Sequence, residues 1–291
     1  MTHHEEQAKR FKKPYWLKKR VPAGHTPEDL GARLNYQGLH TVCQEAKCPN
    51  IWECFSRKTA TFMIMGPLCT RNCSFCAVGH GSSGSPDLRE PTRVAETVKN
   101  LKLDYVVITS VTRDDLSDGG ASLFAKTVEE VRQRMPDTLI ELLIPDFKGD
   151  KEAIKTVVQV FPDVLNHNLE TVSRLYNSVR PEAKYRRSLN LLKLVKTFDS
   201  SIQTKSGIML GLGESSKEIF KTFHDLLEAE CNLLTIGQYL QPTPEHLPVK
   251  RFIHPEKFDY WREIALKIGF AGVASGPFVR SSYQAKQLHH K

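Results

Sequence analysis

The sequence contains no long run of apolar residues. None approaches the roughly 18–20 consecutive apolar residues that a helix needs to cross a membrane. The segment from Met1 to Gln7 is polar and partly acidic, and no apolar stretch follows a basic start, which argues against a secretory signal. We therefore expect a protein of the cytoplasm, where thiols are kept reduced, with no membrane as its partner.

The sequence also lacks internal repeats, apart from an alternation of strands and helices, and its only low-complexity stretch is at 79–85. Apolar residues make up 40% of the 291 residues, which is enough for a hydrophobic core. A chain of this length can form one large α/β domain or two small ones. Barrels often reach this size as a single unit, so we favour one main domain.

Cysteines are few but concentrated. Six of the seven lie between Cys43 and Cys76, and the seventh is Cys231. In a reducing compartment, clustered cysteines are more often metal ligands or catalysts than disulfide partners. Cys231 lies between an expected helix and an expected strand, and we interpret it as a buried core thiol.

Positive charge exceeds negative charge, with a formal net charge of +8. Seven Lys and Arg residues lie between Lys9 and Arg20. On charge alone, a solvated arm is the simplest interpretation. The alternative is a surface that attracts an acidic partner, either nucleic acid or an acidic protein.

Short apolar runs alternate with amphipathic stretches from residue 60 onwards. We expect strands at 60–65, 105–110, 139–144, 164–169, 204–210 and 233–237. We expect helices at 90–101, 121–134, 151–160, 188–197, 216–230 and 256–268. This alternation predicts an α/β fold with a parallel sheet and right-handed crossovers, closed or partly closed as a TIM-type barrel. A doubly wound open sheet is the main alternative, and either fold places the functional site at the carboxyl ends of the strands.

The loop after the first expected strand contains the pattern C-x3-C-x2-C, formed by Cys69, Cys73 and Cys76. Zinc motifs usually present two separated C-x2-C pairs, so a zinc knuckle is the weaker interpretation. Three thiolates within eight residues suit three corners of a 4Fe–4S cluster and leave one iron open. With the aromatic Phe75 before the last cysteine, this pattern resembles the radical S-adenosylmethionine superfamily.

That resemblance implies a mechanism and a second set of residues. The open iron would bind S-adenosylmethionine, and an electron from the cluster would cleave it to a 5′-deoxyadenosyl radical that abstracts hydrogen from unactivated carbon. Asp118-Gly119-Gly120 follows the second expected strand, where many members have Gly-Gly-Glu, although Ala121 replaces the acid here. Gly211, Gly213 and Glu214 lie in a stretch that resembles the adenine-binding segment. The residues expected to contact S-adenosylmethionine are therefore Phe75, Gly119, Gly120, Gly211, Gly213 and Glu214.

The first triplet in chain order, Cys43, Cys48 and Cys54, has the pattern C-x4-C-x5-C, and Arg280-Ser281-Ser282-Tyr283 lies near the carboxyl end. Together with the second triplet, Cys69, Cys73 and Cys76, these motifs resemble the lipoyl synthase family from about residue 39 to 283. The resemblance implies a partial (β/α)6 barrel at 59–277, an N-terminal extension with the basic arm at 1–58 and a tail at 278–291. It also implies an auxiliary 4Fe–4S cluster on the first triplet, with Ser282 as its fourth ligand.

The family's reaction inserts two sulfur atoms, at C6 and C8 of an octanoyl group on a carrier lysine, and consumes the auxiliary cluster as sulfur donor. The implied partners are octanoylated carrier domains (E2 subunits and the glycine cleavage H protein), an electron donor such as ferredoxin or flavodoxin, and an iron–sulfur carrier. No side chain is singled out as catalytic.

Three alternatives are weaker. Biotin synthases lack the upstream triplet. Methylthiotransferases space their first cysteines more widely and add an RNA-binding domain. A zinc-bearing nucleic-acid-binding protein would need finger spacings and an aromatic-interleaved basic motif, which this sequence lacks. His167 could touch a substrate, but a hydrogen-bonded core histidine is the favoured interpretation.

Overall fold

The computed structural model describes residues 13–18, 31–32, 34, 37–56, 61–283 and 285–289. Its centre is an eight-stranded sheet whose order is β1-β2-β5-β6-β7-β8-β9-β10. The strands are β1 (His40–Thr41), β2 (Thr61–Ile64), β5 (Tyr105–Ser110), β6 (Leu139–Leu143), β7 (Val164–Asn166), β8 (Gln203–Leu210), β9 (Leu233–Gln238) and β10 (Gly272–Gly276). All neighbouring strands pair in parallel except β1, which pairs antiparallel with β2.

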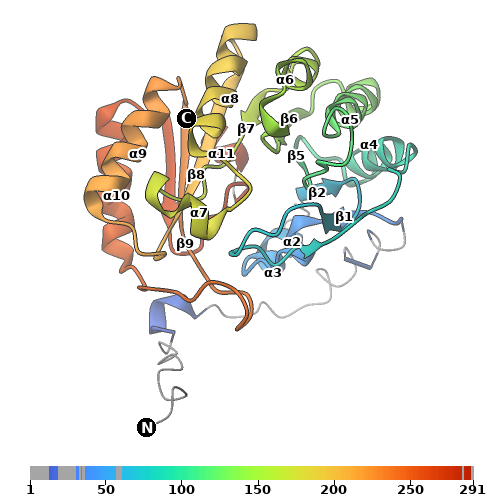
Figure 1. Ribbon diagram of the computed structural model, residues 1–291. Helices are drawn as coiled ribbons and strands as arrows, with labels where there is room; N and C mark the ends of the chain where they lie inside the picture. The colour runs from blue at the N-terminus through green and yellow to red at the C-terminus, as the bar shows by residue number, and fades with distance from the viewer. Residues whose placement is uncertain are drawn as a thin grey trace.

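The long helices form a layer outside the sheet, which curves into an incomplete ring (Figure 1). They are α4 (Glu90–Leu101), α5 (Ala121–Arg134), α6 (Lys151–Val158), α8 (Tyr185–Phe198), α9 (Ser216–Glu228) and α10 (Pro255–Ile268). Strand order follows chain order without a reversal, so the doubly wound alternative, which requires a switch point, is wrong. Within the described residues β1 and β10 are the two edges of the sheet, so the TIM-type barrel is partial, as expected.

Shorter elements connect these units. They are η1 (Tyr15–Leu17), α2 (Val42–Glu45), α3 (Ile51–Ser56), β3 (Leu68–Cys69), β4 (Gly79–His80), η2 (Phe147–Gly149), η3 (Ser173–Leu175), α7 (Tyr176–Val179) and α11 (Ala285–His289). The short pair β3 and β4 was not expected from the sequence, and neither were two strands of the main sheet. The extension at 1–58 contributes β1, and β10 adds a seventh parallel strand beyond the predicted six.

Successive side chains of a strand point alternately to the two faces of the sheet, and the two faces pack against different parts of the protein. Val106 and Ile108 of β5 pack into the main core beneath the helices, whereas Tyr105 and Val107 face the inside of the ring. This is the period of two expected for a strand with both faces buried. No helix in the described part of the chain is long and apolar enough to cross a membrane.

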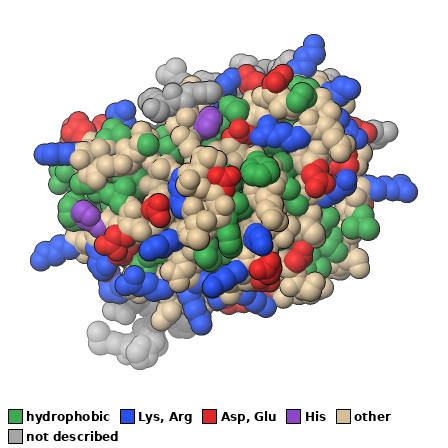
Figure 2. Space-filling model, turned by 90° about the horizontal axis from the view of Figure 1, so that it is seen from above, with side chains coloured by type: hydrophobic (Ala, Val, Ile, Leu, Met, Phe, Trp, Pro, Cys, Tyr) green, Lys and Arg blue, Asp and Glu red, His purple; other side chains and the backbone are tan. Residues whose placement is uncertain are grey.

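The outside of the molecule carries both signs of charge. Figure 2 shows Lys and Arg side chains interspersed with Asp and Glu over one face. On the described part of that face the basic residues do not form the continuous stripe typical of nucleic-acid binding.

Candidate active site

The loop of the C-x3-C-x2-C triplet follows β2, at the carboxyl ends of the strands, as the sequence predicts. A small parallel pair between β3 and β4 joins the two ends of the loop, with Cys69 opposite His80. The backbone N–H of Gly81 donates to the Cys69 carbonyl over 2.9 Å. The three cysteines therefore lie on a closed loop rather than on a free segment.

The cysteines of this triplet are partly buried. Burial raises the pKa of the Cys76 thiol to about 12 and also raises the pKa of Cys73. The Cys69 Sγ accepts hydrogen bonds from the backbone N–H groups of Arg71 (3.4 Å) and Thr112 (3.3 Å). Buried thiols give up their protons when a cation replaces them, so this donor set fits a bound iron–sulfur cluster.

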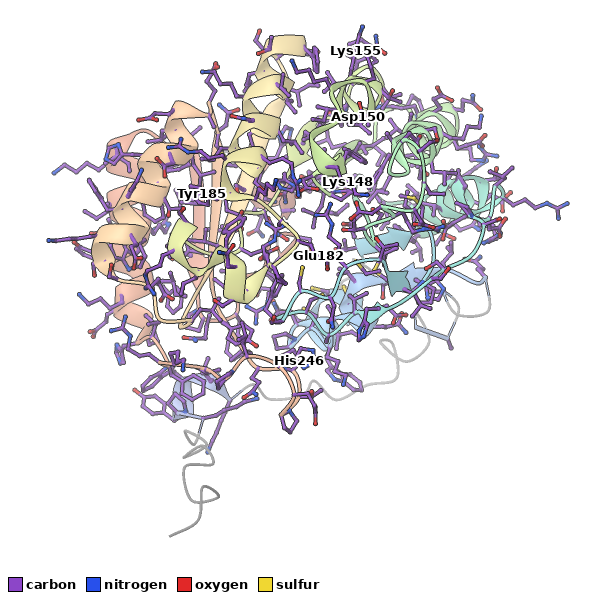
Figure 3. The ribbon with its side chains drawn as sticks, viewed as in Figure 1. Lys148, Asp150, Lys155, Glu182, Tyr185 and His246 are labelled. Atoms are coloured by element: carbon purple, nitrogen blue, oxygen red, sulfur yellow. The ribbon has the colours of Figure 1, made fainter. Side chains whose placement is uncertain are left out.

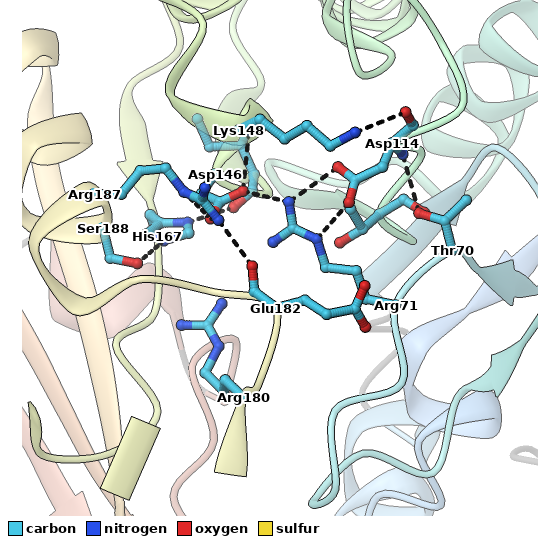
Figure 4. A network of polar contacts seen from close by, with 12 residues as sticks. Thr70, Arg71, Asp114, Asp146, Lys148, His167, Arg180, Glu182, Arg187 and Ser188 are labelled. Atoms are coloured by element: carbon cyan, nitrogen blue, oxygen red, sulfur yellow. Dashed lines mark hydrogen bonds and ion pairs between the residues drawn. The ribbon is translucent and has the colours of Figure 1, made fainter. Parts of the chain in front are cut away.

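Arg71, between the first two cysteines, fixes the loop to the ends of two strands (Figure 4). Its guanidinium donates to both carboxylate oxygens of Asp114 (2.7 and 2.9 Å) and to Asp146 (2.7 Å). Arg187 of α8 donates to the other Asp146 oxygen over 2.7 Å. Because a guanidinium in a two-carboxylate fork has little freedom, the loop is held in one position against the ends of β5 and β6.

The opposite side of the loop is held by the segment after β9. The Nε2 atom of His246 lies 2.8 Å from the Cys76 carbonyl oxygen, and the Leu247 N–H donates to the Ser74 carbonyl over 3.0 Å. His246 is labelled in Figure 3. Phe75 packs with Met209 and Tyr239 in a separate apolar cluster. The aromatic residue of the motif thus has a packing role next to the cysteines.

The first triplet lies on α2, α3 and the turn between them. Cys43 is in α2 and Cys54 in α3, and burial raises the pKa of the Cys43 thiol to about 11. The carboxyl-terminal tail covers this triplet, since the Asn50 side chain donates to the Phe278 carbonyl over 2.6 Å. A small cavity lies between triplet and tail, lined by Cys43, Cys48, Asn50, Cys54, Thr61, Arg280, Ser282 and Tyr283.

A larger cavity of about 410 Å³ connects the two triplets inside the ring. The first triplet contributes Cys43 and Cys48, the second contributes Cys76, and the tail contributes Ser281 and Ser282. The wall is mixed in character. Its apolar members include Val42, Phe75, Val78, Leu143, Ile208, Met209, Leu240 and Val279, and its polar members include Asn168, Glu170, Thr235, Tyr239, Gln241 and Arg280.

Buried polar atoms near this cavity fit a polar ligand. Asn168 Oδ1 and Arg180 Nε are buried, and neither has a hydrogen-bond partner in the described part of the chain. Asn168 donates through Nδ2 to Glu170 over 3.0 Å, and burial raises the pKa of Glu170. Because buried polar atoms are normally paired, these groups are suited to the charged ends of a molecule such as S-adenosylmethionine.

The glycines predicted to contact S-adenosylmethionine do not line the large cavity. Gly119 and Gly120 precede α5 with φ angles of 61° and 89°. A Cβ on Gly120 would lie 2.2 Å from Met65 Sδ, so a side chain is excluded by packing as well as by backbone conformation.

The residues Gly211, Gly213 and Glu214 after β8 are also explained by contacts within the protein. The Glu214 carboxylate accepts from the backbone N–H groups of Gly211 (2.7 Å) and Leu212 (2.9 Å). A Cβ on Gly211, which has a φ of 102°, would lie 2.3 Å from the Gln238 side chain, and Gly213 has a φ of 107°. Glu214 therefore closes its own turn in this structure.

Several residues at or near the cavity were given no site role from the sequence, namely Asn168, Glu170, Arg180, Tyr239 and Arg280. The signal for Asn168 and Glu170 was the polar stretch 166–170 at the end of β7, from which only His167 was considered. That histidine is in the core, with Nδ1 2.8 Å from the Ile144 carbonyl and Nε2 2.9 Å from Ser188 Oγ. Cys231 is also a buried core thiol, as predicted.

The cysteine groups differ from a single-ion site. Among the described residues, no three or more His, Cys, Asp or Glu side chains are placed to hold one metal ion. Cysteines of both triplets instead border a cavity, which suits ligands on separate irons of a cluster.

Comparisons with known proteins agree with this site. The pattern of the Radical SAM superfamily matches residues 63–226. The lipoyl synthase of Desulfotalea psychrophila is 54% identical over 290 residues, covering 100% of this chain and 97% of that protein. The lipoyl synthase of Caldanaerobacter subterraneus subsp. tengcongensis is 56% identical over 277 residues, covering 94% of this chain and 96% of that protein.

Solved structures are similar in fold. The Streptococcus suis SuiB protein bound to S-adenosylmethionine has a TM-score of 0.55 and 12% identity, over 75% of this chain and 51% of its own. HydG, a maturase of the FeFe-hydrogenase, has a TM-score of 0.56 and 12% identity, over 71% of this chain and 49% of its own. The match to the superfamily pattern and the identity to full-length relatives together show that the chain belongs to the lipoyl synthase family of radical S-adenosylmethionine enzymes, which use 4Fe–4S clusters and S-adenosylmethionine.

Proposed function

We propose that this chain converts a protein-bound octanoyl group into a lipoyl group by inserting sulfur at C6 and C8. The observation that carries the proposal is the cavity of about 410 Å³ bordered by cysteines of both triplets. A reaction that generates a radical at one cluster and takes sulfur from another needs both clusters to face one enclosed substrate. This cavity meets that requirement.

The two cysteine triplets would have different roles in this reaction. Cys69, Cys73 and Cys76 would hold the cluster whose open iron takes S-adenosylmethionine, and Cys43, Cys48 and Cys54, with Ser282, would hold the auxiliary cluster. When bound, the cluster on Cys69, Cys73 and Cys76 would supply the electron for S-adenosylmethionine cleavage, and the auxiliary cluster would supply the inserted sulfur.

The cavity wall would position the organic substrates. Apolar side chains such as Leu143, Met209 and Val279 suit an octanoyl chain and exclude water from the radical. Asn168 and Arg180, with their unpaired buried atoms, suit the polar ends of S-adenosylmethionine. The glycines at 119, 120, 211 and 213, with Glu214, would act by shaping the surrounding turns.

The reaction would need protein partners in the cytoplasm. These would be an octanoylated carrier domain (an E2 subunit or the glycine cleavage H protein), an electron donor such as ferredoxin or flavodoxin, and an iron–sulfur carrier that restores the auxiliary cluster. Lys13 and Lys47 are exposed and border the cavity, so an acidic carrier surface would fit there.

Anaerobic turnover with an octanoyl-lysine peptide tests the proposal. The protein carrying both clusters is reduced and supplied with S-adenosylmethionine, and the peptide is weighed by mass spectrometry. We expect two sulfur atoms per peptide and two molecules of 5′-deoxyadenosine. Cleavage of S-adenosylmethionine without any sulfur in the peptide would contradict the proposed function while leaving the radical chemistry intact.

A further inference from the structure

The carboxyl-terminal helix α11 lies inside the ring of strands (Figure 1). Ala285 packs on Tyr105, Val107 and Leu139, while Leu288 packs on Val164 and Leu233. All five of these residues lie at or near the amino ends of their strands. The helix therefore fills the base of the partial barrel.

Polar contacts fix the same helix to the barrel base. Lys286 forms an ion pair with Asp104, just before β5. His289 Nδ1 lies 2.7 Å from the side-chain oxygen of Gln203, the first residue of β8. A Cβ on Gly272, the first residue of β10, would lie 3.1 Å from Leu288 Cδ1, so little space remains around the helix.

The segment just before α11 runs beside the triplet Cys43, Cys48 and Cys54, next to Thr61 at the start of β2. Ser282 borders both cavities beside the first cysteine triplet. The Tyr283 hydroxyl donates to Glu53, next to Cys54, over 2.7 Å. Since three residues of extended chain span about 10 Å, the position of Ala285 limits how far Ser282 can move.

We propose that α11 and Tyr283 are positioning elements that hold Ser282 against the auxiliary cluster. This inference rests on the proposed function, in which Ser282 is the fourth cluster ligand. The Tyr283–Glu53 hydrogen bond anchors the residue next to the serine, and the packing of Leu288 anchors the helix that follows. Weakening either anchor would leave the cysteines unchanged while loosening the oxygen ligand.

A matched pair of substitutions in one helix tests the α11 anchor. Leu288→Ala removes buried apolar contacts, whereas Gln287→Ala changes an exposed neighbour. The protein carries both clusters, and the rate of iron release to a chelator is measured by absorption spectroscopy. The amount of intact cluster on Cys69, Cys73 and Cys76 is measured from its electron paramagnetic resonance signal in the presence of S-adenosylmethionine. We expect Leu288→Ala to release auxiliary iron about tenfold faster or more, because truncating a buried leucine is costly.

The Tyr283 anchor is tested by Tyr283→Phe, Glu53→Ala and the double variant. Each single change should speed auxiliary iron release about tenfold, the size expected for one lost hydrogen bond to a carboxylate, and the double variant should add little more. Glu53→Gln, which keeps an acceptor, should restore much of the wild-type rate.

The outcomes separate this inference from the proposed function. If Ser282→Ala speeds iron release but Leu288→Ala and Tyr283→Phe match Gln287→Ala, the serine is a ligand and the anchoring role is wrong. If Ser282→Ala itself leaves iron release unchanged, the assignment of the fourth ligand is wrong. Equal loss of both clusters in Leu288→Ala, with a lower melting temperature, would reduce α11 to a general packing element and overturn the inference.

Discussion

At the residue scale, the two serines of the tail offer the most direct comparison. Both Ser281 and Ser282 border the large cavity, but only Ser282 also borders the small cavity of the first triplet. Ser282→Ala should lower lipoyl formation at least about tenfold while S-adenosylmethionine cleavage continues, since a hard oxygen ligand is replaceable without disturbing three thiolates. Ser281→Ala should be milder. Product yield and 5′-deoxyadenosine are measured in the same reaction, and equal effects of the two substitutions would contradict the assignment.

His167 gives a prediction about pH. Burial lowers its pKa from 6.5 to about 4, with nearby Arg180 acting in the same direction. Between these values the unfolded chain binds a proton that the folded protein does not, so stability is lost as pH falls through this range. From pH 7 to pH 5 the loss should be about 2 kcal/mol.

Urea unfolding at the two pH values measures that loss. His167→Gln should have lower stability at pH 7 but a smaller pH dependence than the wild type, whereas His224→Gln, on the exposed face of α9, should keep the wild-type dependence. An unchanged pH dependence in His167→Gln would show that other groups account for acid sensitivity.

The cysteine ligands were predicted from sequence spacing alone, because ligand spacing in a loop is a local property. The residues around the cavity could not be found this way. Asn168, Arg180 and Arg280 come from three separate segments, and only the curvature of the sheet brings them beside the cysteines. Their types are common in turns and on surfaces, so their placement depends on tertiary structure.

At the element scale, the cysteine loop is held from two sides, by Arg71 and by the segment containing His246. His246→Ala removes the contact to the Cys76 carbonyl, and we expect the affinity for S-adenosylmethionine to fall about tenfold, the effect of one buried hydrogen bond. Binding is measured by titration of the anaerobic protein. His80→Ala serves as the control, because His80 is exposed on the same loop. Equal affinities in the two variants would show that the His246 contact does not order the loop.

All six strands and six long helices were found within a few residues of their predicted positions, because long periodic segments carry their own signal. β10 was missed because Gly272-Val-Ala-Ser-Gly is short and made of small residues, and it is a strand only because β9 pairs with it. β1 was missed because two residues cannot show a period. The start of α8 was predicted three residues late, at a basic stretch with little apolar signal.

At the scale of the whole molecule, net positive charge should assist recognition of a carrier. Of the basic arm at Lys9–Arg20, the described part covers only 13–18, and it brings Lys13 to the cavity border. Reversing Lys13 and Lys47 to Glu should raise the KM for an intact acidic carrier domain several-fold and leave the KM for a short peptide unchanged.

Salt provides the check on that prediction. At about 1 M salt the Debye length falls to about 3 Å, so the difference between the reversed variant and the wild type should largely disappear. Lys193→Glu, an exposed change on α8 away from the cavity, is the matched control. A KM difference that persists at high salt would indicate a lost packing contact rather than charge attraction.

The proposed auxiliary site joins α2 and α3 to a tail that follows every strand of the sheet, and this has a consequence for biosynthesis. A ribosome that has just added Cys54 must add 228 more residues (282 minus 54) before it reaches Ser282. At about 5–20 residues per second this takes roughly 10–50 s, during which the cysteines exist without their proposed fourth ligand. Iron delivered early would meet three thiols on an unfinished fold. We therefore expect loading of the auxiliary site to be a late event in the life of each molecule, after the last strand has paired and the tail has folded back into the ring.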